Sequence, residues 1–258
     1  MLRKWYGNLD AYLIPAVTLL AFLGAWEAFY HVFSIPKFIV PSPSAIAAAA
    51  WEWRDRFPEH IYETLFATLL GFGVSTIVAL PLAAFIVYSP LLSKAIYPLL
   101  VLSQSIPKVA IAPVLMLLVG TGIESKVIMC VLIAFFPIIV DTAAGLKITP
   151  PELLDLSRSY RSGSLKTFLK IRFPMALPFI FSGLKVGITF SVTGAVVAEF
   201  MGSDRGLGYV IMSATSYWRA DLAFAAMILL SIIAIILFTL VEILERVFCP
   251  WYADRPDH

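Results

Sequence analysis

Charged and polar residues that interrupt long apolar stretches are the first candidates for chemistry in this sequence. Lys108 stands alone as a charged residue in the stretch 95–123, and it follows Ser103 and Gln104. A lysine at mid-membrane costs about 2.5 to 3.5 kcal/mol on insertion scales, so it usually faces protein or water. With the two neighbouring polar side chains, it could attract a small anion. The alternative is a structural lysine that pairs with Glu199 or binds a backbone carbonyl.

A second group of polar residues lies in the apolar stretch 178–198 and directly after it. Ser191 and Thr193 are small, so they could line a path for a solute or let two helices approach closely. Glu199 stands just before a glycine-rich turn, 202–208, and this turn could form part of an external gate. The candidate residues of a translocation pathway are therefore Ser103, Gln104, Lys108, Ser191, Thr193 and Glu199.

Groups that catalyse reactions or bind nucleotides are missing from the sequence. There is no GxxxxGK[ST] loop to cradle phosphates, and no Ser/His/Asp or Cys/His grouping suggests a nucleophile. Cys130 and Cys249 give neither a disulfide framework nor a metal-ligand spacing, and the three histidines are scattered. We therefore predict no catalytic residue, no metal site and no cofactor bound by this chain.

The composition indicates a membrane protein with several spans. Of the 258 residues, 60% are hydrophobic and 14% are charged, and the mean hydropathy is +0.89. An ordinary soluble domain has about 25% charged residues. A soluble enzyme, a disordered protein and a nucleic-acid binder are therefore disfavoured, and the net charge of +2 implies no strongly charged partner. We expect an all-α integral membrane protein with one transmembrane domain, residues 1–258.

Six segments are apolar enough to cross a membrane, which takes about 20 residues each. Pro107 and Pro113 should break the third segment, and broken helices are tolerated where they line a cavity. With the N-terminus in the cytoplasm, the inside segments hold eleven Lys and Arg and the outside segments six, so both termini are predicted to be cytoplasmic. The six segments are residues 11–33, 64–93, 95–123, 127–146, 178–198 and 222–241.

The connection between the fourth and fifth segments, residues 147–173, is polar and basic. Thr149 and Glu152 have the spacing of a capping box around two prolines, which predicts the start of a helix. The sequence Ser162-Gly163-Ser164 should break that helix, and Ser164 can cap a second one. The segment is therefore predicted to form two short helices joined at an angle.

Both short helices carry apolar residues that are unfavourable to expose to water. Leu156 belongs to the stripe of the first helix, and Leu165 and Phe168 share a face of the second. Pro174 and Pro178 mark the return to the membrane. The pair of helices could pack on the protein's own spans, lie on anionic lipid, or dock into the groove of a cytoplasmic partner.

The segment 151–178, PELLDLSRSYRSGSLKTFLKIRFPMALP, resembles the cytoplasmic "EAA" loop of ABC importer permeases. Three more segments are similar to one branch of that family, the permeases for nitrate, sulfonate, taurine and thiamine precursors. The likeness covers nearly the whole chain in the expected order. The three segments are VPSPSA (40–45), SIPKVAIAPVLMLLVGTG (105–122) and GAVVAEFMGSDRGLGYVI (194–211).

Two departures from the family pattern concern this loop. Asp155-Leu156-Ser157 stands where the family has Glu-Ala-Ala, and Asp keeps the charge. Arg161 stands where the family has glycine, so the turn is expected to shift to Ser162-Gly163. The ATPase-coupling residues that the resemblance implies are Glu152, Asp155, Leu156, Ser157, Arg161, Gly163, Leu165, Phe168, Pro174 and Pro178.

The resemblance implies the fold of a type I ABC importer permease with a two-helix coupling loop at 147–173. It implies a transport subunit rather than an enzyme, working by alternating access in the bacterial inner membrane. Two copies of a cytoplasmic ATPase would bind ATP and Mg, a second permease copy would complete the pathway, and a periplasmic or lipid-anchored binding protein would deliver a small anionic solute. An ATP-independent secondary transporter or channel is the main alternative, and a membrane-embedded enzyme is a third.

Overall fold

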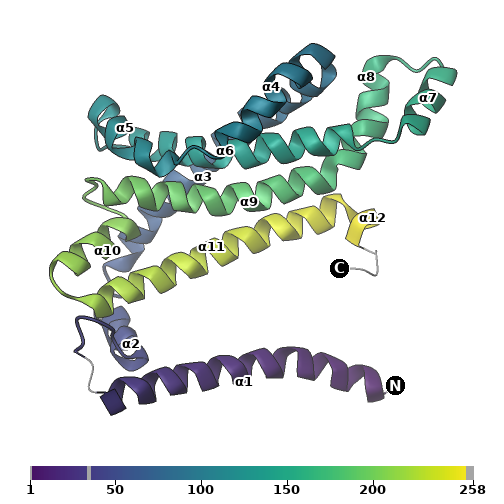
Figure 1. The fold of residues 1–258 in the computed structure, drawn as a ribbon. Helices are drawn as coiled ribbons and strands as arrows, with labels where there is room; N and C mark the ends of the chain where they lie inside the picture. Colours follow the sequence, from purple (N-terminus) through teal and green to yellow (C-terminus); the bar gives the residue numbers. More distant parts are fainter. Residues whose placement is uncertain (1, 34–35, 254–258) are drawn as a thin grey trace. The chain divides into compact units, whose positions relative to one another are not determined.

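A computed structural model describes residues 2–33 and 36–253, and within them every regular element is a helix (Figure 1). The all-α prediction is confirmed. The principal helices are α1 (Leu2–Phe33), α2 (Pro43–Glu52), α3 (Phe57–Tyr88), α4 (Pro90–Ser103), α5 (Ala112–Val119), α6 (Ile123–Lys147), α7 (Pro151–Ser159), α8 (Ser164–Thr167), α9 (Phe173–Phe200), α10 (Leu207–Ser216), α11 (Ala220–Phe248) and α12 (Pro250–Ala253). A 3₁₀-helix, η1 (Lys108–Ile111), precedes α5, and a π-helical segment, η2 (Phe168–Arg172), precedes α9.

Within the described residues, five helical segments are long and apolar enough to cross a membrane, and a bent pair makes a sixth. The pair is α4 with η1 and α5, and the two halves meet at 81°. The break lies at Gln104–Pro107, as the prolines predicted. Pro113, in contrast, sits in the first turn of α5, where its missing N–H costs nothing, so it starts a helix rather than breaking one.

The second predicted segment, 64–93, differs from the observed helices at both ends. Helix α3 begins at Phe57, seven residues earlier, and includes charged residues at its start. It ends at Tyr88 because Ser89 caps the next helix and accepts a hydrogen bond from the Leu92 N–H at 3.4 Å. The absence of charge marks the lipid-embedded part of a helix, whereas caps and prolines determine where the helix ends.

The chain divides into two compact units, and the first consists of Met1–Pro58 and Val210–Leu229. In it, the Glu27 carboxylate accepts hydrogen bonds from the backbone N–H and the hydroxyl of Ser44, at 3.0 and 2.7 Å. The Glu27 carboxylate, which lies in a predicted span, thus has two hydrogen-bond donors from Ser44. Ser42 caps α2, because its hydroxyl accepts from the Ala45 N–H.

Arg219 forms the main ionic contact of the first unit. Its guanidinium donates to both oxygens of Glu52, at 3.1 and 2.9 Å, and also to Asp221. These hydrogen bonds from Arg219 lower the pKa of Glu52 below its ordinary value. The preceding residue, Trp218, closes α10 in the left-handed region at φ +57°, an uncommon position for a bulky side chain.

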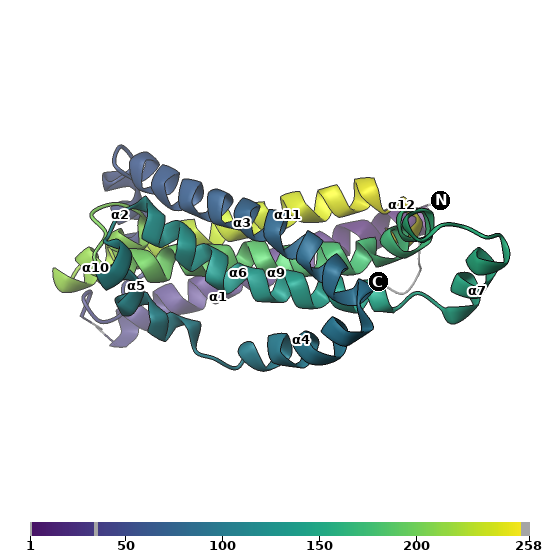
Figure 2. The same ribbon diagram turned by 90° about the horizontal axis from the view of Figure 1, so that it is seen from above.

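The second unit, Glu59–Tyr209 with Leu230–His258, is built around α6 and α9. These helices run side by side in both views (Figures 1 and 2). Their contact is close, and Ala134, Ile138 and Ala195 are all buried in it. Lys185 of α9 forms an ion pair with α11: its ammonium lies 2.7 Å from the Glu245 carboxylate.

Candidate functional site: the α7–α8 loop and the polar groups of the spans

The loop between α6 and α9 lies at one end of the second unit, beyond the ends of both helices (Figure 2). Its first helix, α7, is separate, whereas α8, η2 and α9 form one continuous helical segment, Ser164–Phe200. Pro174 explains the π-helical turn, because it has no N–H to bond the carbonyl of Lys170 and the turn widens there. The second short helix of the prediction is thus the start of a membrane span, and Pro174 and Pro178 lie inside that segment.

The bend of the loop is at Arg161, not at Ser162-Gly163 as expected. Arg161 has φ +50°, and Gly163 has φ −63°. The Ser162 N–H donates to the Ser157 carbonyl at 3.0 Å, and the Arg161 N–H donates to the Arg158 carbonyl at 2.8 Å. This pair of bonds is the Schellman motif, whose left-handed residue is usually glycine. Arginine therefore occupies the same backbone conformation that a glycine would adopt.

We expect Arg161→Gly to stabilise the loop. A non-glycine residue in the left-handed region carries a cost of about 1 kcal/mol, which glycine avoids. The Ser162 amide should therefore exchange its hydrogen about five-fold more slowly in the variant, as measured by hydrogen–deuterium exchange. The matched control is Ser159→Gly, which puts glycine in α7 itself and should speed exchange. If the Ser162 amide exchanged its hydrogen at the same rate in both variants, the strain at Arg161 would be contradicted.

The predicted capping box at the start of α7 is not formed. The helix begins at Pro151 with Pro150 as its N-cap, and no side chain caps it. A residue that precedes a proline is held extended, so Pro150 stays outside the helix and Glu152 no longer stands three residues after the cap. The hydroxyl of Thr149 is buried and has no hydrogen-bond partner.

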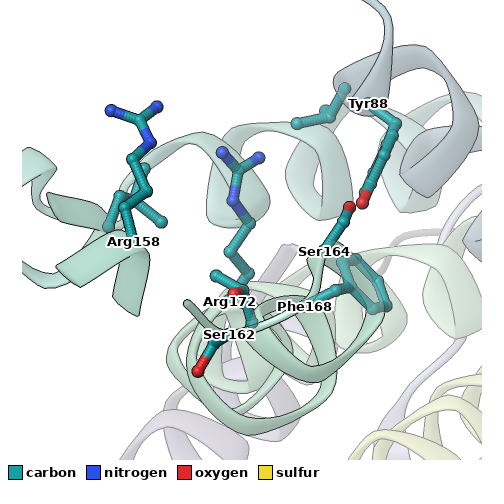
Figure 3. A pocket seen from close by; sticks show the side chains of 9 residues that line it. Tyr88, Arg158, Ser162, Ser164, Phe168 and Arg172 are labelled. Carbon is teal, nitrogen blue, oxygen red and sulfur yellow. The ribbon is translucent and has the colours of Figure 1, made fainter. Parts of the chain in front are cut away.

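The apolar side chains of the loop divide into exposed and packed ones. Leu156 is 53% exposed and Leu165 is 70% exposed. Phe168 instead packs against Tyr88, with ring centroids 6.5 Å apart, and against Phe173. Figure 3 shows Phe168 and Tyr88 on one side of a cavity of about 390 Å³. Arg158 and Arg172 also line this cavity. Leu156 and Leu165 are therefore among the exposed apolar side chains of the loop, whereas Phe168 packs against α3.

Polar contacts hold the two arms of the loop together. Ser157 is buried, and its hydroxyl lies 2.6 Å from that of Thr167 across the bend. Asp155 pairs with Arg158 on the exposed face at 2.8 Å. Glu152 and Gly163 are exposed. Of the three residues at the Glu-Ala-Ala position, the first two face outward and Ser157 closes the hairpin.

The predicted pathway residues of the broken span lie at its bend. Gln104 is exposed, Ser103 is half-buried, and the Ser103 hydroxyl donates to the Leu100 carbonyl at 2.6 Å. The Lys108 ammonium lies 4.3 Å from the centre of the Phe136 ring. Among the described residues, it makes neither the predicted pair with Glu199 nor another ion pair. A cation over an aromatic face at a helix break is available to a ligand.

Helix α9 places its hydroxyl side chains on different faces. Ser191 is fully buried and donates to the Thr68 carbonyl of α3 at 2.8 Å. Thr193 is exposed, as are Thr189, four residues earlier, and Ser182, seven residues before Thr189. Ser182 and Thr189 were not predicted, although spacings of four and seven residues place the three hydroxyls on a common face.

Glu199 lies in a buried polar cluster at the end of α9 that is remote from the loop. Its carboxylate accepts from the Thr64 hydroxyl at 2.8 Å and from the Gly208 N–H at 2.7 Å. Thr64 in turn accepts from the Leu207 N–H at 2.8 Å, and His60 accepts from the Gly206 N–H at 3.1 Å. Side chains of α3 and α9 thus satisfy the N-terminal donors of α10, which have no partners within their own helix.

Lys126 belongs to the same end of the second unit. It is the fourth residue of α6 and is 2% exposed. Its ammonium lies 2.9 Å from the Glu63 carboxylate and 3.3 Å from the Arg205 carbonyl. No local pattern in the sequence marks Glu63, Thr64 or Lys126, because their contacts join residues that are far apart in the chain.

Comparisons with known proteins identify the family of the chain. The family model "Binding-protein-dependent transport system inner membrane component" matches residues 71–253. The chain is 34% identical over 240 residues to the riboflavin transport system permease protein RibX of Chloroflexus aurantiacus, covering 92% of this chain and 90% of the relative. It is 31% identical over 240 residues to the formylaminopyrimidine transport permease protein ThiX of Halalkalibacterium halodurans, covering 93% and 96%.

A solved structure of the MetNI methionine ABC transporter in an inward-facing conformation has the same fold. The TM-score is 0.63 at 20% sequence identity, and the match covers 72% of this chain and 93% of that one. The expected permease fold is therefore confirmed, and these matches give no support to an ATP-independent transporter or channel. The chain belongs to the family of binding-protein-dependent transport system inner membrane components and is the permease subunit of an ABC importer for a small solute.

Proposed function

We propose that the α7–α8 loop is the docking element through which a separate cytoplasmic ATPase drives this permease. The continuous helix from Ser164 to Phe200 carries the proposal, because it joins the loop rigidly to a membrane span. Because the helical segment is continuous from α8 into the span, a displacement at α8 is passed on to the span. The exposed leucines 156 and 165 supply an apolar surface for a helix-in-groove contact.

The remaining partners and the orientation follow from the same proposal. Two ATPase copies bind ATP and Mg, and two permease copies enclose the pathway, since six spans form half of it. A periplasmic or lipid-anchored binding protein delivers the solute on the opposite side. The loop and both termini face the cytoplasm, which agrees with the excess of Lys and Arg on that side.

The docking proposal is tested with Leu156→Asp and Leu165→Asp in the complex of permease and ATPase. A carboxylate buried unpaired in an apolar contact costs several kcal/mol, so ATPase co-purification and ATP-driven uptake in vesicles should each fall by at least about ten-fold. The control is Met201→Asp, which adds the same charge at an exposed site beyond the other end of α9. Undiminished assembly in the leucine variants would refute the docking role. Phe168 is unsuitable, because its replacement would disturb the packing on Tyr88.

We further propose that the bend of the third span and the exposed hydroxyls of α9 line the route of the solute. Ser103, Gln104 and Lys108 supply polar groups at the bend, and Thr193 supplies one on α9. Ser191 and Glu199 act by positioning helices, since both are buried and hydrogen-bonded. Lys108 favours an anionic solute, whereas the relatives named above favour a nitrogen heterocycle. Lys108→Ala in the same uptake assay decides between them. If charge attraction matters, uptake of an anionic solute should fall, whereas uptake of a nitrogen heterocycle should not.

A further inference from the structure

A basic cavity of about 330 Å³ lies where the loop joins the membrane spans, and the proposed function does not use it. It is formed by the end of α3, the N-terminal part of α4, the end of α6, the segment before α7, α7 itself and η2. We call it the basal pocket. Its polar lining consists of Ser93, Lys94, Lys147, Thr149 and Arg172, and its apolar walls are Val87, Leu146 and Leu154.

The charges of the basal pocket are of one sign. Three of its side chains are cations, and no carboxylate lines it. Within the described part of the chain, Lys94, Lys147 and Arg172 take part in no ion pair. Lys147 has one internal contact, its ammonium lying 3.7 Å from the centre of the Tyr97 ring. Three neighbouring cations without a counterion favour the binding of an anion.

Thr149 provides the second, independent observation. The residue lines the basal pocket and is only 7% exposed, and its buried hydroxyl has no hydrogen-bond partner. Buried hydroxyls are nearly always hydrogen-bonded, and an orphan costs about 1 to 3 kcal/mol. Because α7 begins at Pro151 with Pro150 as its N-cap, the Thr149 hydroxyl does not cap this helix. A ligand oxygen in the pocket would satisfy this hydroxyl.

The position of the basal pocket identifies the kind of anion. Lys147 is the last residue of the span α6, and Val87 lies in the last turn of the span α3. The pocket is therefore at the boundary of the membrane, at the depth of lipid headgroups. Basic pockets between spans at this depth bind phosphate-bearing headgroups. Ser93 and Lys94 are the fourth and fifth residues of α4, so they lie near the positive end of its helix dipole.

We propose that the basal pocket binds a phosphate group, supplied by the headgroup of an anionic phospholipid. The phosphate oxygens accept from Lys94, Lys147, Arg172 and the Thr149 hydroxyl. Because these residues belong to α4, α6, η2 and the segment before α7, the bound phosphate ties the base of the coupling loop to two spans. The pocket thus makes the stiffness of the loop depend on the lipid around it.

The test titrates the purified full chain in detergent with short-chain phosphatidylglycerol in one arm and with inorganic phosphate in the other. Lys94→Gln and Arg172→Gln should each weaken binding about five-fold, and Thr149→Val, which keeps the shape of the side chain, should weaken it about ten-fold. The control variants are Lys166→Gln and Lys170→Gln, which remove exposed cations of the same loop outside the pocket. Lys94 is exposed, so its replacement leaves the fold intact.

Weaker binding of phosphatidylglycerol in the pocket variants, with the controls unchanged, supports the lipid headgroup as ligand. If only inorganic phosphate binds and the pocket variants weaken it, the phosphate site stands and its source is a soluble phosphate. Binding that is equally strong in pocket and control variants, or absent in both arms, overturns the proposal. The measurement needs neither ATPase nor transported solute, so its result is independent of the docking experiment.

Discussion

Gly194→Ala is expected to separate α6 from α9 and to destabilise the protein by about 2 kcal/mol. A methyl group at this position would lie 2.7 Å from the Cys130 Cα, and 3.0 Å from both the Cys130 nitrogen and the Met129 carbonyl oxygen. All three are backbone atoms of a buried helix, which cannot move aside as a flexible side chain would. Overpacking of this kind costs about 1 to 3 kcal/mol, and the better helix propensity of alanine offsets only part of it.

The matched control for Gly194→Ala is Gly73→Ala, in the middle of α3. A methyl group at Gly73 meets no other atom within 4 Å, so this variant should be as stable as the original chain or slightly more stable. Thermal unfolding of both variants in the same detergent makes the comparison. Equal midpoints would show that α6 and α9 can adjust, and that the close contact does not contribute to the stability of the fold.

The features that could be predicted from the sequence are those that depend on neighbouring residues. The break near Pro107 followed from the missing N–H of proline. The polar connection after Lys147 followed from polarity and composition, although the next span begins at Ser164, nine residues before the predicted end of the loop at 173. In each case, the physical cause acts within one or two helical turns, so the local sequence contains it.

The features that could not be predicted depend on contacts between distant residues. Lys185 pairs with Glu245, 60 residues later, and Glu199 binds Thr64, 135 residues earlier. No periodicity joins such pairs, and only the packing of whole helices brings them together. The bend at Arg161 was not predicted for a different reason. The sequence predicted that the turn would shift to Ser162-Gly163, but the hydrogen bonds of the turn hold Arg161 itself in the left-handed conformation.

Glu199→Ala is expected to lower the free energy of unfolding by about 3 kcal/mol, because it leaves buried donors without an acceptor. The carboxylate is 1% exposed and accepts from the Thr64 hydroxyl and the Gly208 N–H. Each donor that is stranded in this way costs about 1 to 3 kcal/mol. The first turn of α10 would also lose its cap, so the segment from Gly206 to Gly208 should open more often than the rest of the second unit.

Two further variants separate a positioning role of Glu199 from a simple loss of packing. Glu199→Gln keeps the shape and one acceptor oxygen, so it should restore part of the stability lost in Glu199→Ala. Thr64→Val removes the hydroxyl that accepts from the Leu207 N–H, so it should speed hydrogen exchange at that amide while the Gly208 bond persists. Hydrogen exchange at these two amides is the measurement. If both amides exchange at the original rate in Glu199→Ala, the carboxylate does not cap α10, and its burial must then be explained by packing against Gly206 and Gly208 alone.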